Sequence, residues 1–544
     1  MLPSALRRHV GLVILLALAA PVTIAFCWHG VISTLADDSV SYITVARWIS
    51  PFGRDALLMP WVAYYSHFPP VFPTLLVITG GAWNFLVAHV VVALCALVAL
   101  VMVYAYGAFR LGSPGAGLGL AIVFLLLPSA WISILSILSE PLYLALSLAA
   151  LLLYVRHEED GEVRQPVVLG LLFAAAYLTR VAGVALLAAY AAHLTMRSLA
   201  RRQWPSIRAL APLAIPIVFQ LLWMAIRPAV QSKGYQTDLE VIVKAWLGDP
   251  LKVATFSWGS LMGGWIASFS ADSGVAPTMR FVFGAVGALG AAGAAVGVLK
   301  NRLDSWYVLL SVAMLILWVF PEDNQRRLLY PILPLILVHA AEVVQALGKR
   351  FQAAGRAHFP LLAAGGLVAV LSMPAALLVA QKAVNREPLV EGFGYSLSSM
   401  TQYYTIVNLK GARSWAVRGA AILAGLQMLE AATPPNARIM WTRPEYVVVL
   451  GRREAVPWYF SWDRTMLARE LQRTGTTHII ASRIFKSDLA GADGDAYSAF
   501  AVDTPDYLRL VLAVPDPETR AVEFALLEVD AEGLKRALAA QPRQ

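Results

Sequence analysis

The chain has 544 residues, of which 58% are hydrophobic and only 14% are charged, and its formal net charge at pH 7 is +9. Soluble globular proteins carry charge on about a quarter of their residues, so this chain cannot cover a water-facing surface along its whole length. The positive charge does not indicate nucleic-acid binding, because no basic run with interleaved aromatic residues is present. Cys27 and Cys95 both lie in apolar stretches and indicate neither a disulfide framework nor a metal site.

The charge deficit is uneven along the chain. Residues 1–381 contain 24 basic and 16 acidic side chains, whereas residues 382–544, less than half as many, contain 19 and 18. This step predicts a transmembrane domain over 1–381 and a folded extracytoplasmic domain over 382–544.

Membrane-spanning helices need about 20 mostly apolar residues. The two short stretches on either side of Arg180 could also form one long helix with a buried charge. With these counted separately, eleven spans are predicted, at about 10–28, 84–107, 115–136, 140–155, 165–179, 182–196, 209–227, 280–299, 305–320, 329–347 and 359–381.

The basic residues predict the orientation of the spans. Alternate loops hold 14 of the 24 Lys and Arg of residues 1–381, and such loops are usually cytoplasmic. The N-terminus is then cytoplasmic, and an odd number of spans puts the C-terminal domain outside, although one span more or less would reverse this. We expect a multi-pass protein of the cell inner (plasma) membrane.

Two outer segments carry further structure. The segment 29–83 is predicted to contain a short amphipathic helix at 40–49 that lies on the membrane surface. The C-terminal domain alternates helix and strand patterns and predicts a small α/β sandwich. Its expected helices are 415–429 and 464–473, and its expected strands are 437–441, 477–481, 507–514 and 521–529.

Charge near the hydrocarbon is costly and indicates function by default. Asp37 and Asp38 follow the first span, and one of two adjacent carboxylates there is a candidate proton acceptor. Asp38 could instead cap the helix that begins near Ser39, and both roles can hold together.

Further charged residues fall at the predicted outer ends of later spans. Glu140 is a candidate site residue, although a glutamate in the first turn of a helix also suits the helix dipole. Arg180 interrupts an apolar stretch and is suited to bind a phosphate, unless it reaches the lipid headgroups. Arg326 and Arg327 would need an anionic ligand or the nearby acidic residues 322 and 323 as compensation. Tyr330, which follows them, is a further candidate for substrate binding.

His67, next to two prolines, is a further candidate for substrate binding, although a structural role is commoner there. Taken together, a carboxylate and several arginines would converge at the outer interface. Such a set could deprotonate a hydroxyl and hold a membrane-anchored phosphate.

These motifs resemble those of the GT-C glycosyltransferases, which include protein mannosyltransferases and aminoarabinose transferases acting on lipid A. The stretch DDSVSYITVA resembles their acidic motif, and SHFPPVFPTLL resembles the segment that follows it. SEPLY, YLTRVAG and RRLLYPILPLI are similar to later elements of the same families, in the same order. The resemblance implies a mainly α, polytopic membrane protein of GT-C type with a C-terminal extracytoplasmic α/β domain.

The resemblance also implies an inverting transfer of a sugar from a polyprenyl phosphate to a glycan, lipid or protein acceptor of the envelope. Asp37 would be the catalytic base, with Asp38 as second choice, and Arg180, Arg326 and Arg327 would hold the donor phosphate. Tyr42 and Glu140 would line the site. Asp-Asp stands where the mannosyltransferases have Asp-Glu, which leaves the acceptor open, and the Trp-Trp-Asp motif of oligosaccharyltransferases is missing. Neither a cofactor nor a metal is predicted.

Two other functions remain open at this point. A transporter or flippase of lipid-linked saccharides would also need Asp and Arg near the interface, but normally has charge or broken helices at the bilayer midplane. A non-catalytic partner in envelope assembly remains if the acidic pair is dispensable.

Overall fold

A computed structural model describes residues 8–35, 37–52, 55–159, 162–229, 234–272, 274–351, 359–405, 409–457, 464–482 and 505–539. The chain forms two compact units. We call Met1–Trp28 with Ser66–Gln381 the membrane unit, and His29–Tyr65 with Lys382–Gln544 the loop–tail unit. The segment 29–65 therefore belongs to the same unit as the C-terminal residues.

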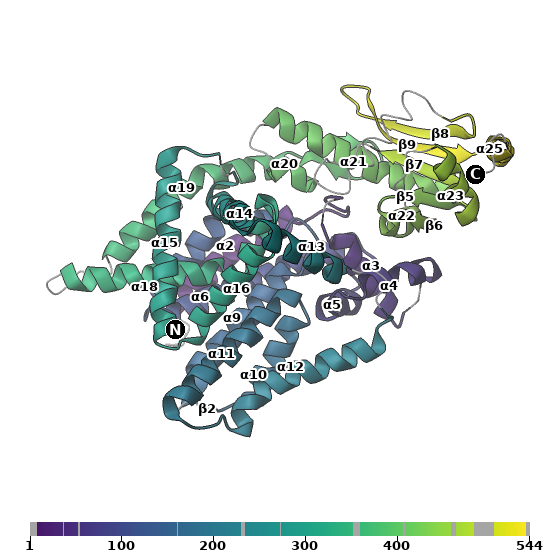
Figure 1. Ribbon diagram of the computed structural model, residues 1–544. Helices are drawn as coiled ribbons and strands as arrows, with labels where there is room; N and C mark the ends of the chain where they lie inside the picture. The colour runs from purple at the N-terminus through teal and green to yellow at the C-terminus, as the bar shows by residue number, and fades with distance from the viewer. Residues whose placement is uncertain are drawn as a thin grey trace. The chain divides into compact units, whose positions relative to one another are not determined.

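The membrane unit is built from helices (Figure 1). A helix lies in each of the eleven predicted apolar stretches. These helices are α2 (Val10–Phe26), α6 (Phe85–Arg110), α7 (Pro114–Leu126), α9 (Glu140–His157), α10 (Pro166–Tyr177), α11 (Val184–Arg201), α12 (Ile207–Ile226), α15 (Pro277–Leu299), α16 (Leu303–Leu317), α18 (Leu333–Phe351) and α19 (Phe359–Val384). Shorter helices connect them: α5 (Val71–Thr79), α8 (Pro128–Ile132), the 3₁₀-helix η2 (Val181–Gly183) and α17 (Glu322–Leu329).

Within the described residues, five helices are long and apolar enough to cross a membrane, namely α6, α11 with η2, α12, α15 and α19. A sixth span results if α17 and α18, which are bent by 71° at a short break, count as one. Apolar helices of 10–17 residues include α2, α7, α10 and α16. The prediction of a mainly α, polytopic membrane protein is confirmed.

Small residues let the helices of the membrane unit approach closely. A Cβ on Gly293 of α15 would lie 2.5 Å from the backbone oxygen of His339 in α18, and one on Gly290 would lie 2.8 Å from that of Ile336. Such glycine stripes are typical of membrane helix pairs, where close van der Waals packing replaces the hydrophobic effect.

Two helices of this unit were not predicted. The segment 228–279 was expected only as an outer segment, but it contains α13 (Gly234–Gly248) and α14 (Pro250–Ser270). The second half of α14, from Leu261 to Ser270, is almost entirely buried, and it packs against α17. Three glycines and several polar residues dilute the apolar pattern of α14, which is why its sequence did not stand out.

The loop–tail unit has two parts. The first holds α3 (Ser39–Ile49), η1 (Ala56–Leu58) and α4 (Met59–Tyr65). The helix predicted at 40–49 is thus present, but nine consecutive residues, 39–47, are buried, so protein covers it on every side. An amphipathic helix with one face on a membrane surface would keep more of its residues exposed, so that part of the prediction is wrong.

The second part is an α/β sandwich around a five-stranded sheet in the order β6-β5-β7-β9-β8. The helices α23 and α25 share a buried core with one face of this sheet, and Gly425 of α21 contacts the ring of Phe524. The predicted α/β domain is confirmed, and its last two strands pair with each other in antiparallel orientation. Its elements are β3 (Pro388–Val390), β4 (Tyr395–Ser396), η3 (Leu397–Ser399), α20 (Thr401–Thr405), α21 (Leu409–Ala432), β5 (Arg438–Trp441), α22 (Pro444–Gly451), β6 (Glu454–Pro457), α23 (Arg464–Thr474), β7 (His478–Ser482), β8 (Leu508–Pro515), β9 (Val522–Val529) and α25 (Ala531–Ala539).

Candidate active site

Three of the predicted site residues meet in the membrane unit. Glu140, the first residue of α9, is fully buried, and its Oε1 atom lies 2.8 Å from Nη1 of Arg180. The same oxygen accepts a hydrogen bond from Nε of Arg327, which lies on α17. The other carboxylate oxygen of Glu140 is buried and has no hydrogen-bond partner within the described part of the chain. One carboxylate therefore brings together two arginines that are 147 residues apart in the sequence.

A sharp turn puts Arg180 in this cluster. The helix α10 ends at Tyr177, and Arg180 has an extended backbone, with φ −154° and ψ 132°, just before η2. A Cβ on Gly183 would lie 2.6 Å from Cα of Tyr177, so the turn requires glycine there. The two short apolar stretches are therefore two helices with Arg180 at the break between them.

The chain just after the predicted residue His67 contacts this turn. The backbone N–H of Val71, at the start of α5, donates to the carbonyl oxygen of Leu178 at 2.9 Å. Val71 is four residues after His67, and Leu178 is two residues before Arg180. His67 itself is half-buried, and its ring stacks on Phe68 with the centroids 4.6 Å apart.

The helix α17 is held close to α14 by two glycines. A Cβ on Gly264 would lie 2.7 Å from the backbone nitrogen of Arg326, and a Cβ on Gly263 would collide with the side chain of Glu322. Arg326 is buried and pairs with Asp323 at 3.9 Å, so an acidic neighbour compensates it in part. Arg326 and Arg327 thus have different partners, and only Arg327 joins Glu140.

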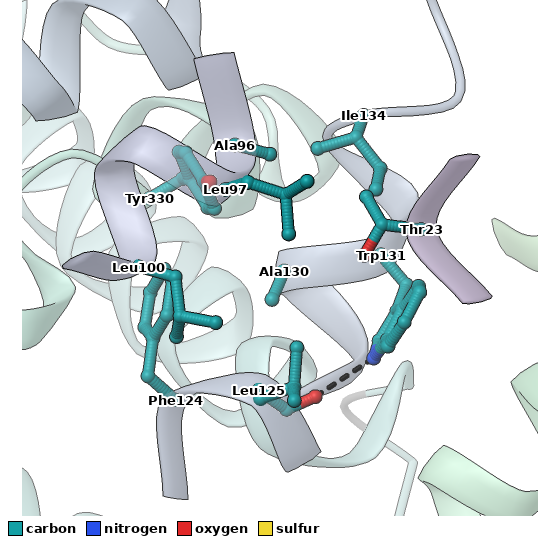
Figure 2. A pocket seen from close by; sticks show the side chains of 10 residues that line it. All are labelled: Thr23, Ala96, Leu97, Leu100, Phe124, Leu125, Ala130, Trp131, Ile134 and Tyr330. Carbon is teal, nitrogen blue, oxygen red and sulfur yellow. Dashed lines mark hydrogen bonds between the residues drawn. The ribbon is translucent and has the colours of Figure 1, made fainter. Parts of the chain in front are cut away.

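Tyr330 connects the charged cluster to an apolar pocket. It is buried at the break between α17 and α18, three residues after Arg327, and its ring centroid lies 5.6 Å from that of Phe124. Figure 2 shows the small pocket that it lines. The remaining lining comes from Thr23 and from apolar side chains of α6, α7 and the α8 region, including Trp131, whose indole N–H donates to the carbonyl oxygen of Leu125.

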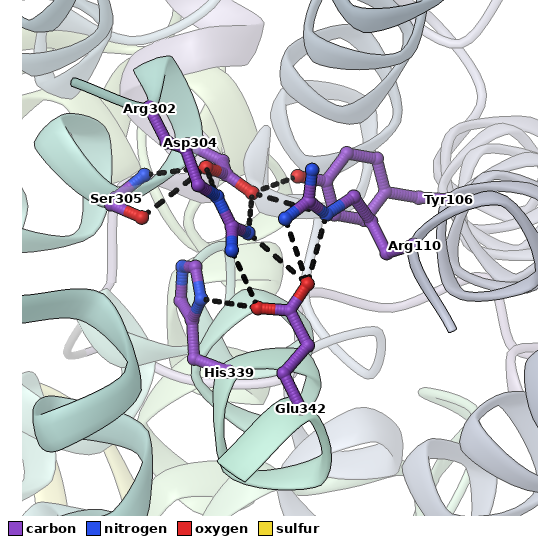
Figure 3. Close-up of polar contacts among 7 residues, drawn as sticks. All are labelled: Tyr106, Arg110, Arg302, Asp304, Ser305, His339 and Glu342. Carbon is purple, nitrogen blue, oxygen red and sulfur yellow. Dashed lines mark hydrogen bonds and ion pairs between the residues drawn. The ribbon is translucent and has the colours of Figure 1, made fainter. Parts of the chain in front are cut away.

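A second charged cluster in the same unit differs in its charge balance. Arg110 and Arg302 pair there with Asp304 and Glu342, at N–O distances of 2.7 to 3.6 Å (Figure 3). Tyr106 donates a further hydrogen bond to Asp304 at 2.6 Å. Two carboxylates neutralise two arginines in this cluster, so it does not attract an anion. In the first cluster, Arg180 and Arg327 both pair with one oxygen of Glu140, and arginine in such a setting is suited to bind a phosphate.

This second cluster has a structural role that the sequence did not reveal. In the sequence, Arg110 and Arg302 are two of the basic loop residues that indicate the cytoplasmic side of the membrane, and nothing there indicates that they form ion pairs. Their partners lie on other helices, since Glu342 belongs to α18, and the network ties α6, α16 and α18 together.

The acidic pair and Tyr42 lie in the loop–tail unit. Asp37 and Asp38 are half-buried just before α3, and Tyr42 on α3 is buried. Asp38 occupies the N-cap position of α3, as predicted, but its side chain makes no capping hydrogen bond. Instead, Oδ1 of Asp37, one residue earlier, accepts the N–H of Ser39, the first residue of the helix, at 2.9 Å.

Two residues beside the acidic pair were missed by the sequence analysis. Glu445 and Tyr446, at the start of α22, are both buried. Burial and the charges of Asp37 and Asp38 hold the pKa of Tyr446 well above its usual range. No sequence motif marks these two residues, because they are far from the acidic pair in the sequence and come near it only when the chain folds.

Among the described residues, no group of three or more His, Cys, Asp or Glu side chains could hold a metal ion. The fold and the site thus define a polytopic membrane protein with a buried arginine–glutamate cluster beside an apolar pocket.

Comparisons with known proteins identify the fold. No protein-family model matches the sequence, and no curated protein matches it. The chain is similar to two solved structures of ArnT from Cupriavidus metallidurans. The form bound to undecaprenyl phosphate has a TM-score of 0.51 at 13% identity, and the apo form has 0.52 at 12%. Each similarity covers 98% of this chain and 99% or 100% of ArnT.

A lower similarity, with a TM-score of 0.45 and 13% identity, relates 88% of this chain to 70% of the oligosaccharyltransferase of Archaeoglobus fulgidus. Identities this low establish the fold alone. The chain has the GT-C fold, as its motifs predicted.

Proposed function

We propose that this protein is a membrane glycosyltransferase that moves a sugar from a polyprenyl-phosphate donor to an acceptor on the outer face of the cell inner membrane. The observation that carries the proposal is the cluster of Arg180 and Arg327 around Glu140, with Tyr330 and an apolar pocket beside it. An amphiphilic anion with a phosphate head and an isoprenoid tail has the chemistry that matches both parts. The similar ArnT structure bound to undecaprenyl phosphate supports the same class of ligand.

The proposed reaction uses the arginines at the leaving group. The acceptor hydroxyl oxygen attacks the anomeric carbon, the bond from that carbon to the phosphate oxygen breaks, and the anomeric configuration inverts. Arg180 and Arg327 stabilise the additional negative charge on the released polyprenyl phosphate. Arg326 has a weaker case as a phosphate ligand, because it pairs with Asp323.

The base in this proposal is Asp37, with Asp38 as the second candidate. It takes the proton of the acceptor hydroxyl as the new glycosidic bond forms. A positioned general base typically contributes about a hundred- to ten-thousandfold in rate. Tyr42, His67, Glu140 and Tyr330 are proposed to line the substrate site. The topology proposed with this reaction places the N-terminus in the cytoplasm and residues 382–544 outside.

A donor-consumption assay tests the proposal. The full-length protein in nanodiscs is given a panel of polyprenyl-phosphate sugars together with an envelope extract as acceptor. We expect Asp37→Asn to lower turnover at least about a hundredfold. Asp55→Asn is the matched control in the same loop: Asp55 caps η1 through Leu57, and asparagine caps equally well.

Three outcomes would count against the proposal. Full turnover in both Asp37→Asn and Asp38→Asn removes the assigned base. Donor consumption that is unaffected by Arg180→Gln and Arg327→Gln removes the phosphate site. Vectorial movement of the lipid in liposomes without turnover would replace the transferase with a flippase.

A further inference from the structure

Hydrogen bonds from the C-terminal domain converge just before the acidic pair. The backbone N–H of Thr401 donates to the carbonyl oxygen of Ser33 at 3.0 Å. The side-chain amide of Gln402 donates to Oγ1 of Thr34 at 2.6 Å, and the hydroxyl of Tyr446 donates to the carbonyl oxygen of Thr34 at 3.2 Å. Thr34 is three residues before Asp37, so its position restricts where the carboxylate can lie.

The same helix, α22, also holds the other end of the segment 29–65. The hydroxyl of Tyr65 donates a hydrogen bond to the carboxylate of Glu445, the residue before Tyr446. Glu445 is buried, and its second carboxylate oxygen has no hydrogen-bond partner within the described part of the chain. Burial raises the pKa of Glu445, and burial together with Glu445 raises the pKa of Tyr65. The raised pKa of Tyr65 keeps its hydroxyl protonated, so that it can donate this hydrogen bond to Glu445.

We propose that Glu445 and Tyr446 are positioning residues. They hold the two ends of the segment 29–65, which we call the acidic loop, so that the proposed base keeps its reactive position. The inference rests on the proposed function and goes beyond it, because it gives the C-terminal domain a part in the reaction. The mechanism acts through Thr34 and Tyr65, and neither Glu445 nor Tyr446 needs to touch the substrate. A displacement of a reacting group by about 1 Å can cost about a hundredfold in rate.

Three hydroxyl deletions in the full-length protein test this inference. Tyr446→Phe removes the bond to Thr34, and Tyr65→Phe removes the bond to Glu445. Tyr395→Phe is the matched control, because Tyr395 is an equally buried tyrosine of the same unit whose hydroxyl has no hydrogen-bond partner among the described residues.

The activity measurement separates positioning from mere stability. In nanodiscs with the best donor of the panel, we expect Tyr446→Phe and Tyr65→Phe to lower kcat about 10- to 100-fold. The KM for the donor should change less than about twofold, and the unfolding temperature should shift no more than in Tyr395→Phe. Unchanged kcat in both variants would overturn the inference, as would a loss of activity that only follows the loss of folded protein.

Hydrogen exchange provides a readout that does not depend on activity. Amides of residues 29–49 should exchange faster in Tyr446→Phe, and those of 55–65 in Tyr65→Phe, whereas Tyr395→Phe should match the wild type. If the wild-type protein consumes no donor, the proposed function fails, and exchange alone then decides whether α22 holds the loop. Exchange rates equal to the wild type in both variants would overturn the inference that α22 holds the two ends of this segment.

Discussion

Replacing Glu140 by glutamine should destabilise the membrane unit, because it removes a buried carboxylate that pairs with both Arg180 and Arg327. At an effective dielectric constant of about 20, each pair is worth about 4 kcal/mol of attraction at a separation of about 4 Å, and the cost of burying Glu140 cancels much of this. Removing one partner of a buried pair typically costs about 3–5 kcal/mol. Glutamine can still accept hydrogen bonds from both arginines, so we expect about 3 kcal/mol.

Thermal unfolding of the purified protein in nanodiscs measures this effect. The expected loss corresponds to a fall in Tm of about 3–4 °C. Asp323→Asn is the control, because Asp323 is 80% exposed and pairs with Arg326 at 3.9 Å. Because Asp323 is exposed and its distance to the buried Arg326 is long, this pair is weak, so the Tm of Asp323→Asn should fall by less than that of Glu140→Gln.

A ligand gives the same experiment a second arm. The charge of the cluster rises by one unit in Glu140→Gln, and a bound phosphate would replace the missing negative charge. Added undecaprenyl phosphate should therefore raise the Tm of Glu140→Gln more than that of the wild type or of Asp323→Asn. A wild-type Tm in Glu140→Gln, or an equal ligand shift in all three proteins, would refute the reasoning.

Two further predictions concern packing and pH. Gly264→Ala should lower the unfolding free energy by about 1–3 kcal/mol, because its Cβ would lie 2.7 Å from the backbone nitrogen of Arg326. Gly259→Ala in the same helix meets open space and should be neutral or stabilising by up to about 1 kcal/mol, so equal effects of the two in thermal unfolding would contradict this packing. Burial lowers the pKa of His478 in β7, so the folded domain resists its protonation and loses stability as the pH falls below about 6.5, the usual histidine value. The Tm should then fall between pH 7 and pH 5 more steeply in the wild type than in His478→Gln, and parallel curves would exclude His478 as the cause.

Local patterns were sufficient to predict most of the secondary structure. Apolar stretches of about 20 residues indicate helices whatever their partners, and alternating apolar residues gave the strands of the C-terminal sheet. The helix α14 was missed because its burial depends on a neighbour: Gly263 and Gly264 weaken its apolar pattern and at the same time permit its contact with α17. Close packing between helices is thus encoded by residues that make a helix harder to recognise.

The residues of the candidate site could be predicted from the sequence, but their contacts could not. Charge in an apolar setting was enough to select Glu140, Arg180 and Arg327, because an unpaired charge there is costly. Their pairing could not be predicted, since the contact between Glu140 and Arg327 spans 187 residues. For Arg326, the sequence left an anionic ligand and an acidic neighbour open, and the structure provides the neighbour.

The acidic loop shows how far a motif can be interpreted without its surroundings. Asp37 and Asp38 attract attention because two adjacent carboxylates are costly to bury, but the groups that hold them in place are common residues in ordinary sequence contexts. The hydrogen bonds from Gln402 and Tyr446 to Thr34 span 368 and 412 residues. Selection on the geometry of the acidic pair would therefore act on α20 and α22 as well, and the reaction proposed at the acidic pair would then require the C-terminal domain.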